Sequence, residues 1–503
     1  MEKGSPPEIN APPPQGYLAR PLAVLFLLSL LATLIYSNTF SSPFYFDDTR
    51  NIVENPQIKD LSNFLGFSGS RAVGFLSFAL NYHFNGLNVF GYHLVNLLIH
   101  ITNGFLVYSL VLLLFKACAS DRGSQQLPTV NSQLAAAPWI ALVTALLFVS
   151  HPIQTQAVTY IVQRFASLVA LFYLLTLVCY VKWRLASPEA RSRSLWYAGA
   201  LLSTFLAMKT KENSFTLPFM ILLVEAVFFR PFTRKRWVAL IPFLLTLLII
   251  PVSRGDALGE AEGFARDTTA ISRSDYLFTQ FRVIVTYLRL LLLPINQNLD
   301  YAYPIYRSLF EPSVFPSFLF LSSLFALSLY LLFASRLTPS ASRLTSFGIL
   351  WFFLTLSIES SIIPIRDVIF EHRLYLPSVG FFMTLSVGVT MGWKRLQRRG
   401  IPAAWGVIGL GAAVLVLSAT TYQRNLVWHD AMTLWQDVVK KAPNKGRGHN
   451  SLGTAMLERG ELGEAIKHYR EALRINPAYA QAHYNLGTAM LERGELGEAI
   501  KHY

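Results

Sequence analysis

The sequence predicts an all-α protein: a polytopic bundle of transmembrane helices followed by an α-solenoid of repeated helical hairpins. Three observations lead to this fold class. Hydrophobic residues make up 53% of the 503 residues and charged residues only 14%, whereas a soluble domain usually carries about 25% charge. Apolar runs recur along most of the chain, many of them near the length of about 20 residues that a membrane span requires. The segment Leu452–Tyr469 then recurs without change as Leu486–Tyr503, at an offset of 34 residues.

Composition and charge exclude several other classes of protein. The mean hydropathy of +0.39 is a poor fit to a soluble domain, a disordered chain or a disulfide-rich secreted scaffold. The net charge of +14 does not indicate a nucleic-acid partner, because the basic residues are spread over short loops, as the positive-inside rule describes. Cys118 lies in a polar loop and Cys179 in an apolar run, so we expect neither a disulfide framework nor a cysteine metal site. No metal site is predicted.

Eleven apolar runs are candidate spans, which together give a membrane domain over residues 21–424. The first, 22–36, follows a Pro-rich leader (residues 1–20) and lacks an Ala-x-Ala cleavage pattern, so we expect a retained signal anchor. The other runs are centred near 92–115, 137–150, 158–181, 195–208, 214–229, 237–252, 313–334, 344–363, 374–392 and 401–420.

Basic loops orient these spans. Four loops are rich in Lys and Arg: 182–193, 230–236, 336–343 and 394–399. All four lie in the cytoplasm if the leader is cytoplasmic and residues 280–293 do not cross the membrane. The long loops 39–90 and 253–312 then face outside, together with the C-terminal repeats. The absence of an Asn-x-Ser/Thr sequon favours a bacterial inner membrane with a periplasmic array over the endoplasmic reticulum of a eukaryote.

The 34-residue period is typical of tetratricopeptide repeats (TPRs). The small, aromatic and proline positions of that repeat are Gly453, Ala465, Tyr469, Ala472 and Pro477 in one copy, and Gly487, Ala499 and Tyr503 in the next. A degenerate half-repeat precedes them, so the array is expected over residues 425–503. About three repeats are needed for stability, and the sequence stops within a helix, so we expect a piece of a longer array. Such an array binds a protein or peptide in its groove.

Adjacent carboxylates at Asp47 and Asp48 follow the first span. Two carboxylates at a membrane surface can divide labour, one accepting a proton from an acceptor hydroxyl and the other orienting that hydroxyl. The alternative is a solvated turn before a helix, with Asp48 as N-cap.

Polar residues in the other outer loops are candidate ligands for an anionic lipid headgroup. His151 opens a helix whose N-terminus favours an anion, or it only caps that helix. Arg164 lies in an apolar helix, where an arginine is a functional candidate, unless it extends to the membrane interface.

Two further clusters complete the set. Lys209, Lys211 and Glu212 lie between two spans on the outer side, where basic residues run against the charge rule. They fit a lipid phosphate or an internal Lys–Glu pair. Glu371 and Arg373 open a later span, as phosphate ligands or as interfacial charges. No Walker loop or Rossmann glycine pattern is present, so an activated lipid-linked substrate is the expected energy source.

These segments together resemble the transmembrane and tetratricopeptide repeat-containing O-mannosyltransferases and their bacterial homologues, within the glycosyltransferase C superfamily. The matching segments run in the family's order and are Phe46–Asp48, Gly91–His100, His151–Val158, Lys211–Asn213, Glu371–Ser378 and Arg424–Trp428. Gln154 and Gln156 stand where eukaryotic members have His and Glu, which resembles the bacterial branch.

The resemblance implies an inverting glycosyltransferase with its active site at the outer membrane face. It implies Asp47 or Asp48 as the catalytic base, a polyprenyl-phosphate sugar as donor, and a Ser or Thr hydroxyl as acceptor. Arg164, Lys211 and Arg373 would hold the donor phosphate. Two alternatives stay open: a related membrane enzyme that acts on a lipid or cell-wall glycan or transfers an oligosaccharide, and a non-catalytic membrane scaffold that recruits proteins through its TPRs.

Overall fold

The computed structural model describes residues 21–66, 68–120, 136–229, 233–255, 271–334, 340–361 and 363–503. The leader 1–20, and the basic residues Arg230 and Arg336, lie outside these ranges. Within them the chain is helical and contains no strand, so the predicted all-α fold is confirmed.

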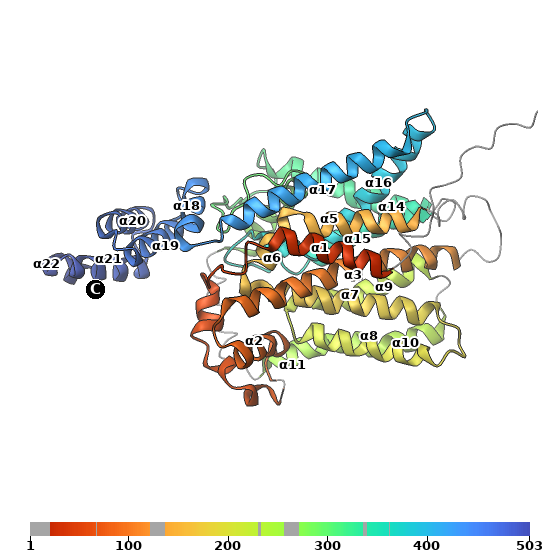
Figure 1. Cartoon of the computed structure of the whole chain (residues 1–503), viewed down its shortest axis with the longest axis horizontal. Helices are drawn as coiled ribbons and strands as arrows, with labels where there is room; N and C mark the ends of the chain where they lie inside the picture. The colour runs from red at the N-terminus through yellow and green to blue at the C-terminus, as the bar shows by residue number, and fades with distance from the viewer. Residues whose placement is uncertain are drawn as a thin grey trace, which may run out of the picture.

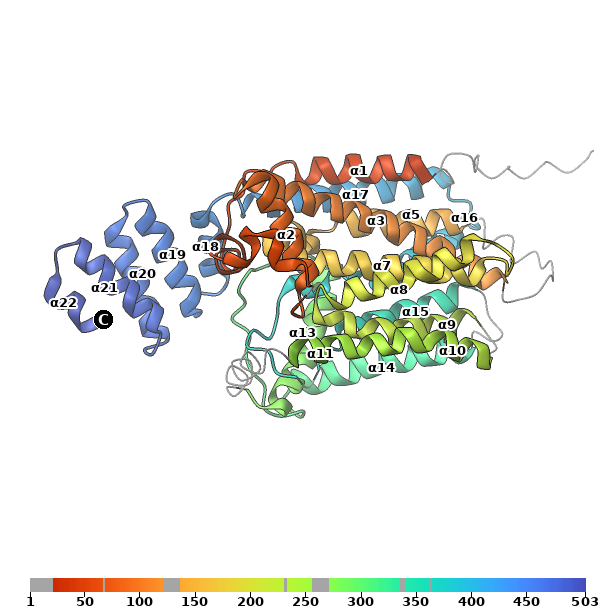
Figure 2. The same ribbon diagram turned by 90° about the horizontal axis from the view of Figure 1, so that it is seen from below.

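The membrane domain is a bundle of helices that run roughly along one direction (Figures 1 and 2). Each of the eleven apolar runs overlaps one of these helices. Their bounds are α1 Pro21–Tyr36, α3 Val89–Ser120, α5 Ala137–Ser150, α7 Arg164–Leu185, α8 Ser192–Met208, α9 Leu217–Phe228, α10 Arg234–Leu245, α11 Ile249–Gly255, α13 Arg273–Leu292, α14 Val314–Ala334, α15 Ser340–Leu356, α16 Pro377–Gln397 and α17 Ala403–Leu426.

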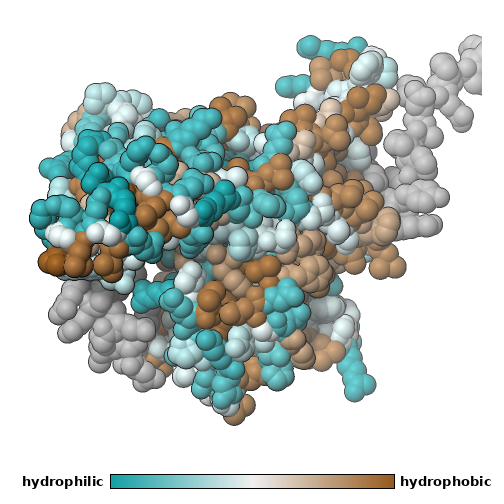
Figure 3. Space-filling view, turned by 60° about the vertical axis from the view of Figure 1, so that its left-hand side comes forward, coloured by the Kyte–Doolittle hydropathy of each residue, from teal (hydrophilic) through white to brown (hydrophobic). Residues whose placement is uncertain are grey.

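Several bundle helices have the length and composition of membrane spans. Among the described residues, five helices are long and apolar enough to cross, and a sixth if α5 and the bent segment Pro152–Val158 form one broken span. Large apolar side chains cover the outside of the bundle, for example Phe26, Val238, Phe320 and Leu415. Figure 3 shows this hydrophobic surface on the bundle and a hydrophilic surface over the array. Such an exposed apolar surface is typical of a membrane protein; the number of spans stays a prediction.

Polar side chains on α3 join the bundle from within. His100 contacts the Tyr375 hydroxyl at 2.8 Å, and the Asn103 amide donates to the same hydroxyl at 3.0 Å and to the Ser167 carbonyl at 2.8 Å. Away from water, each such group needs a protein partner. These contacts therefore fix how α3, α7 and the start of α16 pack.

The two ends of the bundle differ. The first loop, with its short helix α2 (Ala72–Asn85), lies at the end that carries the array, whereas the α7–α8 and α16–α17 connections lie at the opposite end (Figures 1 and 2). Those two connections contain the basic loops 182–193 and 394–399. The predicted orientation requires these two loops to lie on one side; that this side is the cytoplasm stays a prediction.

Five helices form the array: α18 Ala431–Lys441, α19 Gly446–Glu458, α20 Leu462–Ile475, α21 Ala480–Glu492 and α22 Leu496–His502. The small consensus residues allow close pairing, because a Cβ on Gly453 would lie 2.7 Å from the Tyr469 ring. In the second copy a Cβ on Gly487 would lie 3.2 Å from the Tyr503 ring. Ala465, Ala472 and Ala499 are fully buried. The predicted TPR hairpins are thus present.

Candidate active site

Asp48 is a buried residue of the long loop that follows α1, which the sequence predicts to lie outside. Only 1% of it is exposed, and its carboxylate oxygens accept backbone hydrogen bonds from Tyr45 at 3.0 Å and Val162 at 2.7 Å. Burial raises the pKa of Asp48 to about 8, although these two hydrogen bonds act to lower it. Because Val162 lies just before α7, Asp48 ties the first outer loop to the bundle.

Asp47 is exposed instead. Its backbone N–H donates to the Tyr160 hydroxyl at 2.9 Å, and the preceding Phe46 has a left-handed backbone with φ of 50°. Such a conformation costs about 1–3 kcal/mol outside glycine, so surrounding contacts must hold it. Partial desolvation raises the pKa of the Asp47 carboxyl, while Tyr160 and Arg447 act to lower it. Of the two carboxylates, Asp47 is the one that a substrate hydroxyl can approach.

Arg71, Lys211 and Arg373 form a cationic cluster, because the charges of all three act on the same residue, His372. The Lys211 ammonium contacts Glu359 at 2.7 Å, and the Arg71 guanidinium makes a fork with both oxygens of Glu212 at 2.9–3.3 Å. Forked arginine–carboxylate contacts are strong and directional. The charge of Asp47 also acts on Arg71, so Arg71 is the member of the cluster that interacts with the exposed aspartate.

Arg373 belongs to the same cluster. Its guanidinium donates to the backbone carbonyls of Asp367 at 2.7 Å and Val368 at 3.2 Å. Burial, followed by the charges of Lys211, Arg373 and Arg71, holds the pKa of His372 well below its usual value. The charges of all three cations therefore act on one neutral histidine.

Local structure places these side chains. Arg71 is the N-cap residue of α2, and Lys211 has an extended backbone (φ −159°) between the end of α8 and a short 3-10 helix, Glu212–Thr216. Within the described part of the chain, one carboxylate oxygen of Glu359 is buried without a hydrogen-bond partner. Buried acceptors of this kind are uncommon, so the cluster has capacity for another donor group.

Other predicted ligands lie elsewhere or are already engaged. Arg164 is fully buried and donates to the Asn96 side chain at 2.6 Å and to the Tyr92 carbonyl at 2.9 Å, so the structure gives it a packing role instead. His151 is buried and its ring accepts from the Ile153 N–H at 3.1 Å, which is the capping alternative.

Lys209 and Glu371 also have protein partners. The Lys209 ammonium donates to the Ser253 hydroxyl at 2.6 Å. Glu371 is 1% exposed and accepts from the Asn298 backbone at 2.7 Å, the Tyr301 hydroxyl at 2.6 Å and the Gln297 amide at 2.8 Å. Glu371 therefore shapes the loop 297–301, and the cation whose charge acts on it most is Arg424.

Sequence reasoning missed Arg71, Tyr160, Glu359 and Arg447. Arg71 could have been identified from the sequence, because it is a basic residue in a loop predicted to lie outside, where the positive-inside rule expects few basic residues. The others gave no signal, because each becomes relevant only through contacts between residues 80 or more positions apart in the sequence. No group of three or more His, Cys, Asp or Glu that could hold a metal ion occurs in the described ranges.

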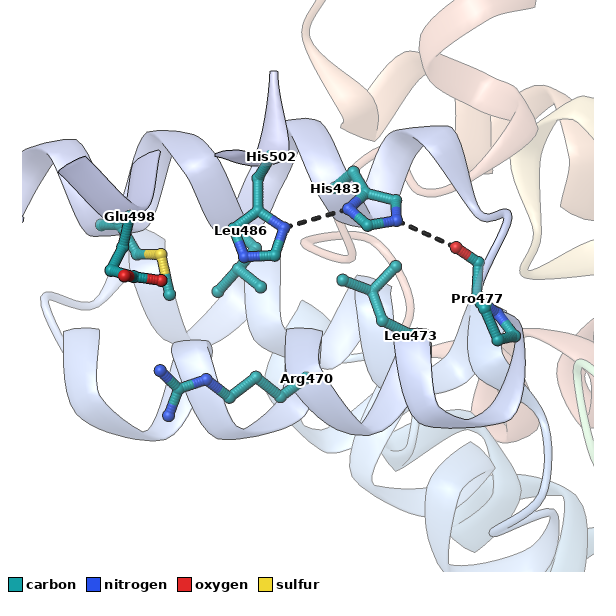
Figure 4. Close-up of a pocket in the computed structure, with 8 residues that line it drawn as sticks. Arg470, Leu473, Pro477, His483, Leu486, Glu498 and His502 are labelled. Carbon is teal, nitrogen blue, oxygen red and sulfur yellow. Dashed lines mark hydrogen bonds between the residues drawn. The ribbon is translucent and has the colours of Figure 1, made fainter. Parts of the chain in front are cut away.

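The array carries a hollow of about 360 Å³. Figure 4 shows its lining, in which His483 lies between His502 and the carbonyl of Pro477. Arg470 and Glu498 supply opposite charges, and Leu473 and Leu486 an apolar wall. Mixed linings of this kind suit an extended peptide.

Comparison with known proteins agrees with the sequence and the fold. A family model described as TPR repeat matches residues 453–494. The chain is 25% identical to Protein O-mannosyl-transferase Tmtc3 of Drosophila melanogaster, over 90% of this chain and 55% of that protein. The human proteins named Protein O-mannosyl-transferase TMTC2 and TMTC4 are each 26% identical, over 88% and 89% of this chain and 61% and 66% of theirs.

The resemblance to the TPR-containing O-mannosyltransferases is confirmed. The chain spans a little over half the length of the first of these relatives. The similarity covers the membrane domain as well as the repeats, because about 90% of the chain takes part. No solved structure matches the chain.

Proposed function

We propose that the chain is an integral-membrane glycosyltransferase that moves a sugar, mannose in the first instance, from a polyprenyl-phosphate carrier to a Ser or Thr hydroxyl of a protein. The observation that carries the proposal is the exposed Asp47 carboxylate, which directly follows Phe46 at the contact with the TPR array and whose charge acts on Arg71 of the cation cluster. The names of the relatives, all protein O-mannosyl-transferases, support the same reaction class.

The chemical step requires one base. Asp47 accepts the proton of the acceptor hydroxyl as the hydroxyl oxygen forms a bond to C1 of the sugar. The bond between C1 and the phosphate oxygen breaks, and its electron pair leaves with the polyprenyl phosphate. Attack opposite to the leaving group inverts C1. A positioned general base contributes about 10²–10⁴-fold to such a rate.

Arg71, Lys211 and Arg373 are proposed to hold the donor phosphate. Cations aimed at the leaving phosphate stabilise the charge that develops there in the transition state. Each now has a carboxylate or carbonyl partner, so a bound phosphate would share or replace these contacts. Lys209 and Glu212 would contribute at the edge of this site.

The TPR array is proposed to present the acceptor protein. Binding a peptide on a rigid array next to Asp47 makes transfer effectively intramolecular and raises the local concentration of hydroxyls. The proposed topology places this array and Asp47 on the extracytoplasmic side, where a lipid-linked donor supplies the activated sugar.

The test uses the purified full chain in liposomes with undecaprenyl-phosphate mannose. Mass spectrometry then compares envelope proteins from a deletion strain before and after incubation. Hexose on Ser or Thr that appears only with enzyme and donor supports the proposal. Hexose on lipid or cell-wall glycan would favour the related membrane enzyme, and no transferred sugar in any fraction would favour the scaffold.

A further inference from the structure

The TPR array is joined to the outer loops of the membrane domain by an ionic cluster centred on Arg447. This residue lies at the start of α19, and its guanidinium forks onto Asp300 at 2.6 and 2.7 Å. It also contacts both oxygens of Asp367, at 2.8 and 3.2 Å. One arginine thus joins the array to two separate loops of the bundle.

The cluster is largely shielded from water. Side-chain exposure is 20% for Arg447, 4% for Asp300 and 21% for Asp367. Lys445 adds a second cation, 3.2 Å from Asp300. Partly buried, forked ion pairs of this kind are geometrically demanding, and removing one partner leaves uncompensated charge. The contact is therefore a fixed joint between the two units.

The joint continues to the loop that carries Asp47. The Arg447 guanidinium lies 5.0 Å from the centre of the Phe46 ring, and Trp435 of α18 packs edge-on against the same ring at 6.0 Å. Phe46 is the residue with the left-handed backbone immediately before Asp47. The array thus supplies the cation and the aromatic ring that hold Phe46 in its strained conformation.

The opposite side of the joint is built on Glu371. Its three hydrogen bonds shape the loop 297–301, which contains Asp300. The Lys441 ammonium of α18 also donates to the Gln297 carbonyl of this loop at 2.7 Å. Contacts therefore run without interruption from Glu371 through Asp300 and Arg447 to Phe46 and Asp47.

We propose that Arg447 is a positioning residue of the active site, through which the first full TPR hairpin sets the orientation of Asp47. This inference rests on the proposed function. It makes the array part of the catalytic centre in addition to any role in binding the acceptor. The charged and titratable groups that act on Asp47 are Arg447, Asp367, Arg50 and Tyr160, together with its neighbours Asp48 and Arg71.

The test measures the pH profile of sugar transfer by the full chain in liposomes, with undecaprenyl-phosphate mannose and the envelope proteins described above. R447Q removes a cation near Asp47 and also frees the negative charge of Asp367, and both changes disfavour ionised Asp47. The acid limb of the profile should therefore move to higher pH. A misplaced base should lower kcat by about 10- to 100-fold, with the KM for the donor unchanged.

Two variants keep the result interpretable. R447K retains the charge but loses the fork, so its acid limb should stay at the wild-type position while kcat falls. Arg474 is an exposed residue of α20 whose partner is Glu471, and R474Q should match the wild type. If R447Q keeps the wild-type profile and kcat while D47N is inactive, this inference is wrong and the proposed function stands. If the wild type transfers nothing, the proposed function fails and the inference fails with it.

Discussion

At the residue scale, Asp47 and Asp48 are neighbours with different surroundings and therefore different roles. Both carboxyl oxygens of Asp48 accept a hydrogen bond from a backbone N–H group, and one of these donors, Val162, lies 114 positions further along the chain. Asp47 has its carboxylate at the surface; Tyr160 holds its backbone N–H and also forms a hydrogen bond with its side chain. A buried carboxylate with two backbone donors organises a loop, whereas an exposed one beside cations is available for proton transfer.

Replacing Asp48 with Asn should destabilise the fold. Both oxygens of Asp48 can accept a hydrogen bond whether the carboxyl is protonated or ionised, whereas an amide has one acceptor oxygen and an NH₂ group, so the N–H of Tyr45 or Val162 loses its partner. An unsatisfied buried donor costs about 1–3 kcal/mol. Thermal unfolding of the purified variant should show a lower Tm, with D47N as the matched control at the wild-type value. Equal Tm values for both variants would contradict the structural role of Asp48.

The raised pKa of Asp47 predicts where activity is lost in acid. Transfer requires the ionised base, so the rate falls as the pH drops through this pKa. A freely exposed aspartate has a pKa of about 4. Because desolvation raises the pKa of Asp47 above that value, the acid limb of kcat/KM should lie at higher pH than it would for a freely exposed aspartate. A profile that stays flat down to about pH 4 would contradict this environment for the base.

At the scale of elements, hydrophobic patterning predicted most helices, and small-residue spacing predicted the TPR hairpins. Patterning also predicted the break after residue 150, but it does not give the angle between the two helices. The segment after α5 bends by 52° at His151–Pro152, because His151 caps a new short helix and Pro152 cannot donate a backbone hydrogen bond. The packing role of Arg164 could not be predicted from the sequence either. Its hydrogen-bond partners, the Asn96 side chain and the Tyr92 carbonyl, lie on another helix, α3, and meet it only in the folded bundle.

Close pairing of α19 and α20 predicts a specific sensitivity at Gly453. G453V would place a Cβ 2.7 Å from the Tyr469 ring, and overpacking of this kind costs about 1–3 kcal/mol. Gly463 in α20 has open space around it, so G463A should be neutral or slightly stabilising. Limited proteolysis of the full chain measures this, with faster cleavage of the array expected for G453V alone. Equal protection of the two variants would show that the pair tolerates a wider separation.

At the scale of the whole molecule, the membrane bundle, its first long loop with α2 and the array meet at one end (Figures 1 and 2). The sequence predicted the two units and their order, and it placed the aspartate pair on the side of the array. It did not predict the joint between them. Arg447 reads as an ordinary surface residue of a repeat, and Asp300 and Asp367 lie 147 and 80 positions away from it. Only folding brings these charges together beside Phe46.

The arrangement predicts which residues share a compartment. Cysteines introduced at the exposed positions Ser41 and Lys467 should react with a membrane-impermeant maleimide from outside, whereas one at Arg191 should react only after permeabilisation. The native Cys118 and Cys179 are buried, so background labelling should be low. Labelling of positions 41 and 191 from the same side would contradict the proposed orientation.

The most direct test of the account is the rate of sugar transfer by D47N in the full chain. Asn keeps the size of the side chain and the backbone contact with Tyr160 but cannot accept the hydroxyl proton. The predicted result is a loss of about 10²–10⁴-fold in kcat at an unchanged Tm and unchanged KM for the donor. Transfer at the wild-type rate would contradict the assignment of Asp47 as the base, and with it the mechanism proposed for this protein.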